Sequence, residues 1–287
     1  MPTSLSWLRR CAACLLLLLA AASTSSSGAP PPASGPAVRL YALNSGSLSY
    51  GDMATFSDTG DYDGRPGEIP VPYFLIRHPK GYLLWDTGLS PDAADLYGPY
   101  GIIAKVGDPL PKQLARLGLT PDHIQYLAMS HLHADHAGNA NLFKRSTWLL
   151  SRREIAWATA NPPPPGVAPW LFSYYSQARV QWIGDDDYDV FGDGSVRILR
   201  APGHSAGHAV LMLRLAHAGT VILSGDLAHL RASYKYRRVP TTNDNRAETL
   251  ASFDRVDRLL ANYHARLIIQ HAPEDFASLP KFPAYLD

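Results

Sequence analysis

Short apolar runs bounded by glycine, proline and aspartate recur along the chain from Val38 onward. Runs of this length between turn residues are typical of β-strands, and nearly continuous ones are typical of strands buried on both faces. The predicted strands are Val71–Arg77, Tyr82–Trp85, Ile124–Met129, Thr147–Leu150, Val196–Leu199, Ala209–Leu215, Val221–Leu223 and Leu267–Gln270.

Three other stretches have apolar residues at helical spacing. In the longest of them, Leu250, Phe253 and Val256 fall on one face, and Asn243-Asp244 could cap its start. Strands dominate each half of the chain and helices cover them, so we predict an α/β layered sandwich. The predicted helices are Leu110–Leu117, Arg152–Thr159 and Arg246–Tyr263.

The N-terminal segment differs from the rest of the chain. Arg9-Arg10 precedes an apolar run, Cys11–Ala22, and small residues with serine, proline and glycine follow it. This order is typical of a secretory signal peptide, and the run is short for a membrane span of about 20 residues. We therefore predict a signal peptide over 1–22, a disordered segment over 23–37 and one folded domain over 38–287. A periplasmic or secreted protein is expected; an uncleaved membrane anchor is the alternative.

Composition limits which partners and which reactive groups the protein can be expected to have. The formal net charge is +1, and without a basic stripe the sequence gives no reason to expect a nucleic-acid partner. Both cysteines, Cys11 and Cys14, lie in the predicted signal peptide. The mature protein would then contain no disulfide and no thiolate to bind a metal or attack a substrate.

The densest set of metal-binding side chains follows the predicted strand that ends at Met129. The next nine residues read S-H-L-H-A-D-H-A-G, which places His131, His133, Asp135 and His136 within six positions. Imidazole and carboxylate groups suit Zn²⁺, Fe²⁺, Mn²⁺ or Co²⁺, and alternate residues of an extended segment can turn towards one ion. The sequence therefore predicts a metal site at the end of this strand.

Three further strand ends carry candidate ligands. A glycine-rich turn, A-P-G-H-S-A-G-H, follows Leu199 and offers either His204 or His208. Asp226 follows the strand Val221–Leu223, and His271 ends the last strand. Layered α/β folds gather chemistry at strand ends, so we expect these side chains to meet.

Together these motifs resemble the metallo-β-lactamase superfamily. Its H-x-H-x-D-H signature is matched from His131 to His136, its G-H-(S/T)-x-G-H turn from Gly203 to His208, and its D-T-G at Asp86. The resemblance extends from about residue 38 to the end of the chain. It implies a four-layer αβ/βα sandwich and favours His204 as the ligand in the turn.

Carried over position by position, the resemblance implies two divalent metal ions, Zn first, with Fe, Mn or Co as alternatives. Asp86 would orient the histidine loop from behind. The implied ligands are His131, His133 and His204 for one ion, Asp135, His136 and His271 for the other, and Asp226 between them.

Residue 226 separates branches of the family. B1-type β-lactamases have cysteine there, and B3-type enzymes lack the bridging carboxylate. Glyoxalase II-like thioesterases usually carry a C-terminal helical extension, whereas this chain ends soon after His271. The chain looks closest to N-acyl-homoserine lactonases, through Pro72–Gly81, Ser130–Gly138 and His271–Phe276. Many of these have tyrosine three residues after the bridging aspartate, where this chain has His229.

The resemblance implies a hydrolase domain that opens lactone rings, N-acyl-homoserine lactones first, as in quorum quenching. Asp135 would carry a proton to the leaving alkoxide and His229 would assist at the carbonyl oxygen. Other ester, thioester or organophosphate hydrolases of this fold are alternatives, and a non-catalytic metal-dependent binding protein is one of another class.

The expected partner is a small-molecule lactone or ester, with no stable membrane association after signal cleavage. Dimers are common among relatives, so a homodimer is compatible with the sequence. Aromatic loops at Tyr50–Phe56, Trp170–Tyr175 and Tyr234–Tyr236 are expected to contact the substrate.

Overall fold

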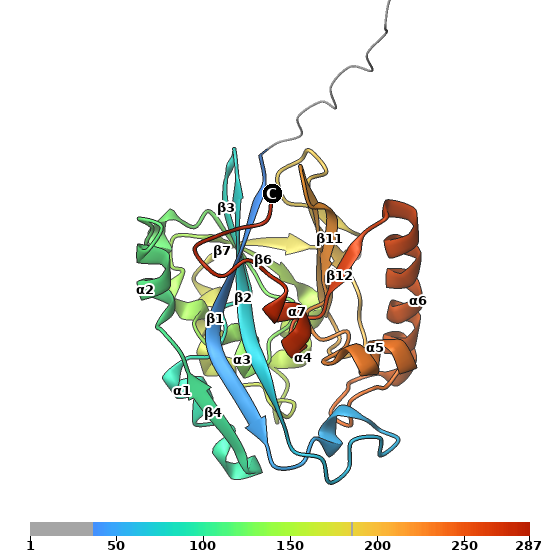
Figure 1. The fold of residues 1–287 in the computed structure, drawn as a ribbon. Helices are drawn as coiled ribbons and strands as arrows, with labels where there is room; N and C mark the ends of the chain where they lie inside the picture. The colour runs from blue at the N-terminus through green and yellow to red at the C-terminus, as the bar shows by residue number, and fades with distance from the viewer. Residues whose placement is uncertain (1–36, 185) are drawn as a thin grey trace, which may run out of the picture. The chain divides into compact units, whose positions relative to one another are not determined.

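Two β-sheets lie face to face in the computed structural model, which describes residues 37–184 and 186–287 (Figure 1). The seven-stranded sheet has the order β4-β1-β2-β3-β5-β6-β7, and the five-stranded sheet has the order β12-β11-β10-β9-β8. The strands are β1 (Arg39–Tyr50), β2 (Gly67–His78), β3 (Gly81–Trp85), β4 (Ile102–Val106), β5 (Tyr126–Ala128), β6 (Thr147–Ser151), β7 (Arg179–Ile183), β8 (Tyr188–Asp189), β9 (Val196–Arg200), β10 (Ala209–Leu215), β11 (Gly219–Leu223) and β12 (Arg266–Ile268).

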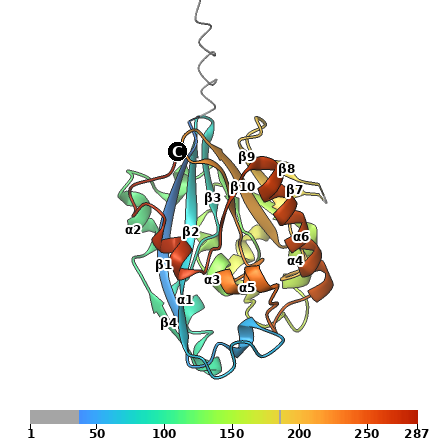
Figure 2. The same ribbon diagram turned by 45° about the vertical axis from the view of Figure 1, so that its right-hand side comes forward.

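Helices cover the outer faces of both sheets, with α6 and α5 on the five-stranded sheet and α1 and α2 on the other (Figures 1 and 2). The α-helices are α1 (Pro91–Ala94), α2 (Leu110–Ala115), α3 (Ala134–Ala137), α4 (Arg152–Ala158), α5 (Arg231–Tyr236), α6 (Arg246–Tyr263) and α7 (Pro273–Ala277). The 3₁₀ helices are η1 (Ala54–Phe56), η2 (Gly98–Tyr100), η3 (Pro121–His123), η4 (Ala140–Leu142) and η5 (Pro169–Ser176). None of the helices in the described ranges has the length and apolar character to cross a membrane.

Alternating side chains along the strands build three apolar layers. On β10, Leu211 and Leu213 face the space between the two sheets, whereas Val210 and Met212 pack with Phe253 of α6. Successive side chains of a strand point to opposite faces, so a strand apolar at every position is buried on both. The third layer lies between the seven-stranded sheet and its helices. The predicted four-layer αβ/βα sandwich is confirmed.

The long helix α6 has the predicted bounds but a different cap. Asn245, and not Asn243-Asp244, is the N-cap, and its side chain accepts a hydrogen bond from the backbone N–H of Glu248. The side chains of Asn243 and Asp244 are used elsewhere. The first accepts from Thr249 Oγ1 (3.1 Å) and the second from the indole N–H of Trp157 (2.9 Å).

The sequence reading missed several strands, among them β1, which is one of the two longest, and the edge strand β4. The predicted signal peptide, 1–22, and residues 23–36 of the predicted disordered segment lie outside the described residues. The strands that carry candidate ligands were predicted, and the candidate site lies at their ends.

Candidate metal centre

The histidine loop begins directly after β5. His131 and His133 lie on its extended part, and His133 is the residue from which α3 starts, so Asp135 and His136 fall in the first turn of that helix. This change from extended chain to helix turns the first pair of side chains and the second pair towards two different points. All four residues are buried.

Four of the predicted ligands form a first group. Ligand atoms of His131, His133, His204 and Asp226 all lie within 4.8 Å of one another. His133 Nδ1 lies 2.9 Å from His131 Nε2 and 3.1 Å from His204 Nε2. The group therefore joins the loop after β5, the turn between β9 and β10, and the end of β11.

The other three predicted ligands form a second group. Ligand atoms of Asp135, His136 and His271 lie within 4.8 Å of one another, and all three residues are buried. The Nε2 atoms of His136 and His271 are 3.1 Å apart, and each lies about 3.5 Å from Asp135 Oδ2 (3.6 and 3.5 Å).

The carboxylate of Asp226 lies between the two groups. Its Oδ2 faces the first, at 3.6 Å from His131 Nε2 and 3.5 Å from His204 Nε2. Its Oδ1 faces the second, at 3.4 Å from His136 Nε2 and 3.1 Å from His271 Nε2. One oxygen for each group is the arrangement of a carboxylate that can bridge two cations.

The chemistry of the two groups fits divalent metal ions. Among the described residues, buried Asp226 Oδ1, which faces the second group, has no hydrogen-bond partner, which is rare for buried polar atoms. Burial lowers the pKa of His131 and His204 well below 6.5, so their imidazoles are neutral and keep a lone pair.

The electrostatic environment of the second group favours a positive charge. Burial opposes protonation of His136, but the carboxylates of Asp226, Asp135 and Asp86 outweigh it and raise its pKa well above 6.5. A cation among these carboxylates would replace that proton.

Asp86 supports the histidine loop from behind, as predicted. It is fully buried and has a positive φ of 60°, which aspartate tolerates better than most residues. Its Oδ1 accepts from the Ser130 backbone N–H (2.7 Å). Its Oδ2 lies 3.0 Å from His136 Nδ1 and accepts from Gln270 Nε2 (2.8 Å). This fixes the ring so that Nε2 faces the second group.

His208 lies outside both groups because its two ring nitrogens are already bonded. Its Nδ1 donates to the carbonyl of Ala201 (2.9 Å), and its Nε2 accepts from the backbone N–H of Asp226 (3.0 Å). The ring therefore holds the backbone at Asp226 in place and has no free lone pair for a cation.

His229 lies beside the centre. Its Nε2 is 3.1 Å from Asp226 Oδ2, and its ring stacks on that of His271 and packs against Phe56. It belongs to neither ligand group, and it lines the cavity in front of them.

The cavity has a volume of about 570 Å³ and is floored by His133, Asp135, His204 and Asp226. This size is typical of small-molecule sites. Its walls come from β1, from the segment around Leu96–Ile102, and from the loop Pro163–Val167. Its apolar lining residues include Leu48, Phe56, Ile69, Leu96, Ile102 and Val167.

Only one of the three aromatic loops expected at the substrate lines this cavity. Tyr50 and Phe56 do so, but none of the described lining residues belongs to Trp170–Tyr175 or Tyr234–Tyr236. Sequence reasoning missed Tyr97, which also lines it. Burial, with the charge of Asp135 next, raises the pKa of Tyr97 well above 10, so its phenol stays a neutral donor.

Comparison with known proteins agrees with this geometry. Residues 66–271 match the family model described as the metallo-beta-lactamase superfamily. The chain is 30% identical to the N-acyl homoserine lactonase AttM of Azorhizobium caulinodans over 87% of its own length and 99% of the relative's. It is 26% identical to the N-acyl homoserine lactonase AiiA of Bacillus thuringiensis subsp. kurstaki, over 78% and 89%.

A solved structure with the same fold is an N-acyl homoserine lactone hydrolase with its product N-hexanoyl-L-homoserine bound at the catalytic metal center. The TM-score is 0.76 and the identity 25%, over 86% of this chain and 98% of the other.

Proposed function

The chain belongs to the metallo-β-lactamase superfamily, and from this premise we propose that it is a metal-dependent hydrolase that opens the lactone ring of N-acyl homoserine lactones. The observation that carries the proposal is the position of Asp226. It offers one oxygen to each of two histidine groups on the floor of a cavity that apolar side chains also line. The names of the relatives indicate the substrate class.

His131, His133 and His204 would hold one ion, Asp135, His136 and His271 the other, and Asp226 both. Nitrogen and oxygen ligands in these numbers suit Zn²⁺, with Fe, Mn or Co as alternatives. When bound, two such ions supply a Lewis acid for the ester carbonyl and lower the pKa of a coordinated water.

Two side chains of the cavity handle the substrate. His229 lines the cavity beside Asp226, and in this proposal its imidazole donates a hydrogen bond to the lactone carbonyl oxygen as negative charge develops there. Asp135 has a lowered pKa, because His136 and His271 outweigh its burial, so it is ionised at neutral pH. It therefore has to take up the proton that the attacking water loses before it passes a proton to the ring oxygen. Water adds across the ester and gives the hydroxy acid.

The acyl chain would lie along apolar residues of the cavity. Leu48 of β1 and Ile69 of β2 line the cavity, as do Leu96 and Ile102. An aliphatic chain gains about 0.8 kcal/mol for each buried CH₂ group, which favours substrates with acyl chains long enough to reach these residues.

The test is pH-stat hydrolysis by the purified chain with its metals quantified. The panel holds N-acyl homoserine lactones of several chain lengths, γ- and δ-lactones, S-lactoylglutathione, an aryl phosphotriester and a cephalosporin. We expect chelator-sensitive lactone opening with about two metal ions per chain, and its loss in D226A and H133A. Turnover confined to another substrate would contradict the lactonase assignment and leave the centre standing. No turnover in the metal-loaded protein would support a binding protein.

A further inference from the structure

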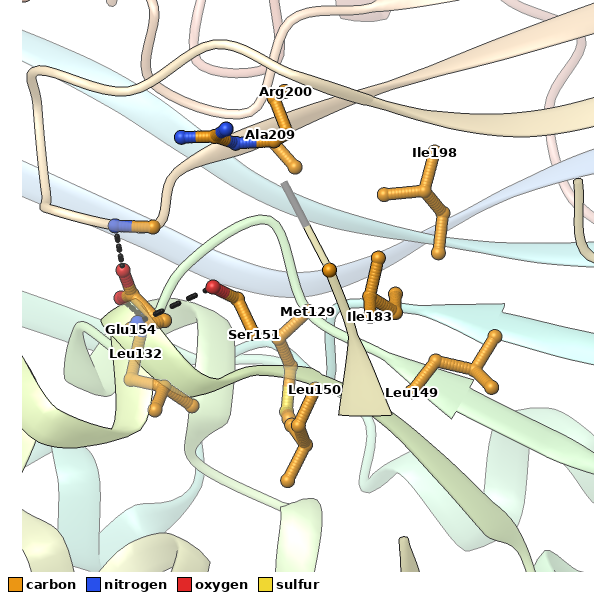
Figure 3. A pocket seen from close by; sticks show the side chains of 12 residues that line it. Met129, Leu132, Leu149, Leu150, Ser151, Glu154, Ile183, Ile198, Arg200 and Ala209 are labelled. Carbon is orange, nitrogen blue, oxygen red and sulfur yellow. Dashed lines mark hydrogen bonds between the residues drawn. The ribbon is translucent and has the colours of Figure 1, made fainter. Parts of the chain in front are cut away.

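Glu154 is a buried carboxylate next to the candidate metal centre that the proposed reaction does not use. It is the third residue of α4, and the N-cap of that helix, Ser151, accepts from its backbone N–H. Its side chain is buried, with 5% of the residue exposed, at the edge of a small cavity between the two sheets (Figure 3).

This carboxylate accepts hydrogen bonds from both histidine-bearing loops. Its Oε1 accepts from the backbone N–H of Leu132 (2.9 Å), which stands between His131 and His133. Its Oε2 accepts from Ser205 Oγ (2.7 Å) and from the Gly207 N–H (2.8 Å). Ser205 directly follows His204 in the chain.

The two loops come from different sheets. The first leaves β5 of the seven-stranded sheet, and the second joins β9 to β10 of the five-stranded sheet. The Glu154 carboxylate therefore links one loop from each sheet at the point where the first ligand group is assembled. A change in its length or hydrogen bonding would change the spacing of the two loops.

Gly207 shows how closely α4 approaches the second loop. A Cβ atom built on Gly207 would lie 2.6 Å from the backbone nitrogen and the Cβ of Glu154. No other residue fits at that separation without moving the helix. The second glycine of the G-H-S-A-G-H turn is thus explained by its contact with Glu154.

We propose that Glu154 is a positioning residue that fixes His131 and His133 relative to His204, and so sets the affinity of this first group for its metal ion. The proposal rests on the metal centre of the proposed function and is independent of its lactone specificity. A carboxylate is needed because three donors converge on it and it can accept from all of them.

The informative variant is E154Q, which keeps the shape of the side chain. Glutamine has one acceptor oxygen, so its NH₂ group must face either Leu132 N–H or the Ser205 and Gly207 donors. Residues that hold metal ligands in place typically change metal affinity about 10- to 100-fold when altered. We expect this loss at one of the two zinc sites and no comparable loss at the other.

The measurement is a zinc titration of the metal-free protein in competition with a chromophoric chelator. It is run at pH 8, because burial raises the pKa of Glu154 to about 7 and the carboxylate must be ionised. The variant H271A shows which zinc-binding step belongs to which ligand group, because it removes a ligand of the second group and leaves the first group intact. E154Q should weaken the zinc step that remains in H271A by the same factor as in the wild-type background.

S205A is a milder variant, for the case that E154Q does not fold. It removes one donor to Glu154 and should weaken the same step about two- to tenfold. The matched control is D193N. Asp193 also accepts from a serine backbone N–H (3.0 Å) and hydroxyl (2.6 Å), both of Ser195, but lies at the opposite end of β9 from the histidine turn.

The outcomes separate positioning from general stability. Selective loss of one zinc step in E154Q, with both steps kept in D193N, supports the proposal. Unchanged zinc binding in E154Q, or equal weakening of both steps, overturns it. A wild-type chain that takes up no zinc would overturn the proposed metal centre itself, which is a different result.

Discussion

The substitution D86N isolates the support behind the second ligand group. Asparagine is close to aspartate in size, and it tolerates the positive φ of 60° at this position, so the backbone should stay in place. The change removes one acceptor oxygen from a fully buried site. The experiment therefore asks what the carboxylate itself contributes.

The cost follows from the donors that converge on Asp86. If the asparagine of D86N keeps its oxygen towards the Ser130 N–H (2.7 Å in the wild type), its NH₂ group faces Gln270 Nε2 and His136 Nδ1. His136 can give up its Nδ1 proton and accept there, but that leaves its remaining proton on Nε2, where a metal ion would bind. Gln270 also donates to the Pro72 carbonyl (3.1 Å), so turning its amide round breaks that bond. At least one buried donor is left unpaired at about 1–3 kcal/mol, and the Ser130 bond loses its charge assistance, so we expect about 3 kcal/mol in total.

Urea unfolding of the chelator-treated protein gives this cost, and zinc titration gives the effect on the centre. We expect the affinity of the second group to fall about 10- to 100-fold while the first group binds as before. A D86N protein that loses less than about 1 kcal/mol and binds both zinc ions normally would refute the reasoning. It would mean that the hydrogen bonds to Asp86 do not hold His136.

Four further predictions use other parts of the chain. H229F should lower kcat/KM for the lactone about 10- to 1,000-fold at unchanged metal content, and H229Y should recover part of it, in steady-state assays. F253A should destabilise the fold by about 3–5 kcal/mol in urea unfolding, because the ring is fully buried between α6 and β10. Burial lowers the pKa of His78 despite its Asp193 partner. Below pH 6.5 the unfolded chain therefore binds a proton at His78 that the folded chain does not bind. In excess zinc, the free energy of unfolding should therefore fall more steeply from pH 6.5 to 5.5 in the wild type than in H78Q. The predicted signal peptide implies export, so a C-terminally tagged full chain should appear in the periplasmic fraction released by osmotic shock and should be shorter than the encoded sequence. Full-length protein in the cytoplasm would contradict this prediction.

The buried strands could be predicted because burial on both faces leaves a continuous apolar run, as in Ala209–Leu215. The strands that were missed alternate or carry polar residues. β1 contains N-S-G-S between apolar residues, and its register shifts between Asn44 and Ser47, so its polar positions lie at a bulge. The edge strand β4 reads I-I-A-K-V and was missed despite its apolar residues; at the edge of the sheet it leaves three of its five residues exposed. Pairing partners far away in sequence decide such strands, and a local pattern does not contain them.

The ligand set was predictable for a related reason. Four of its residues stand within six positions, and the other three end buried strands, so the local sequence carries the signal. The choice between His204 and His208 was not decided by the residues, because both follow glycine in one turn. It depends on which ring finds other partners. His208 is bonded to Ala201 and to the backbone of Asp226, contacts that only the folded chain provides.

Glu154, which sequence reasoning missed, acts mainly on backbone atoms. Glu154 accepts from the N–H groups of Leu132 and Gly207, and any residue at 132 would present the same N–H. Asp86 was found through a motif and Glu154 through none, yet each carboxylate anchors one ligand group. If both act as argued, D86N and E154Q weaken different zinc steps, and the double variant loses the sum of the two effects. Weakening of the same step by both variants would show that the two ligand groups respond to the histidine loop as one unit.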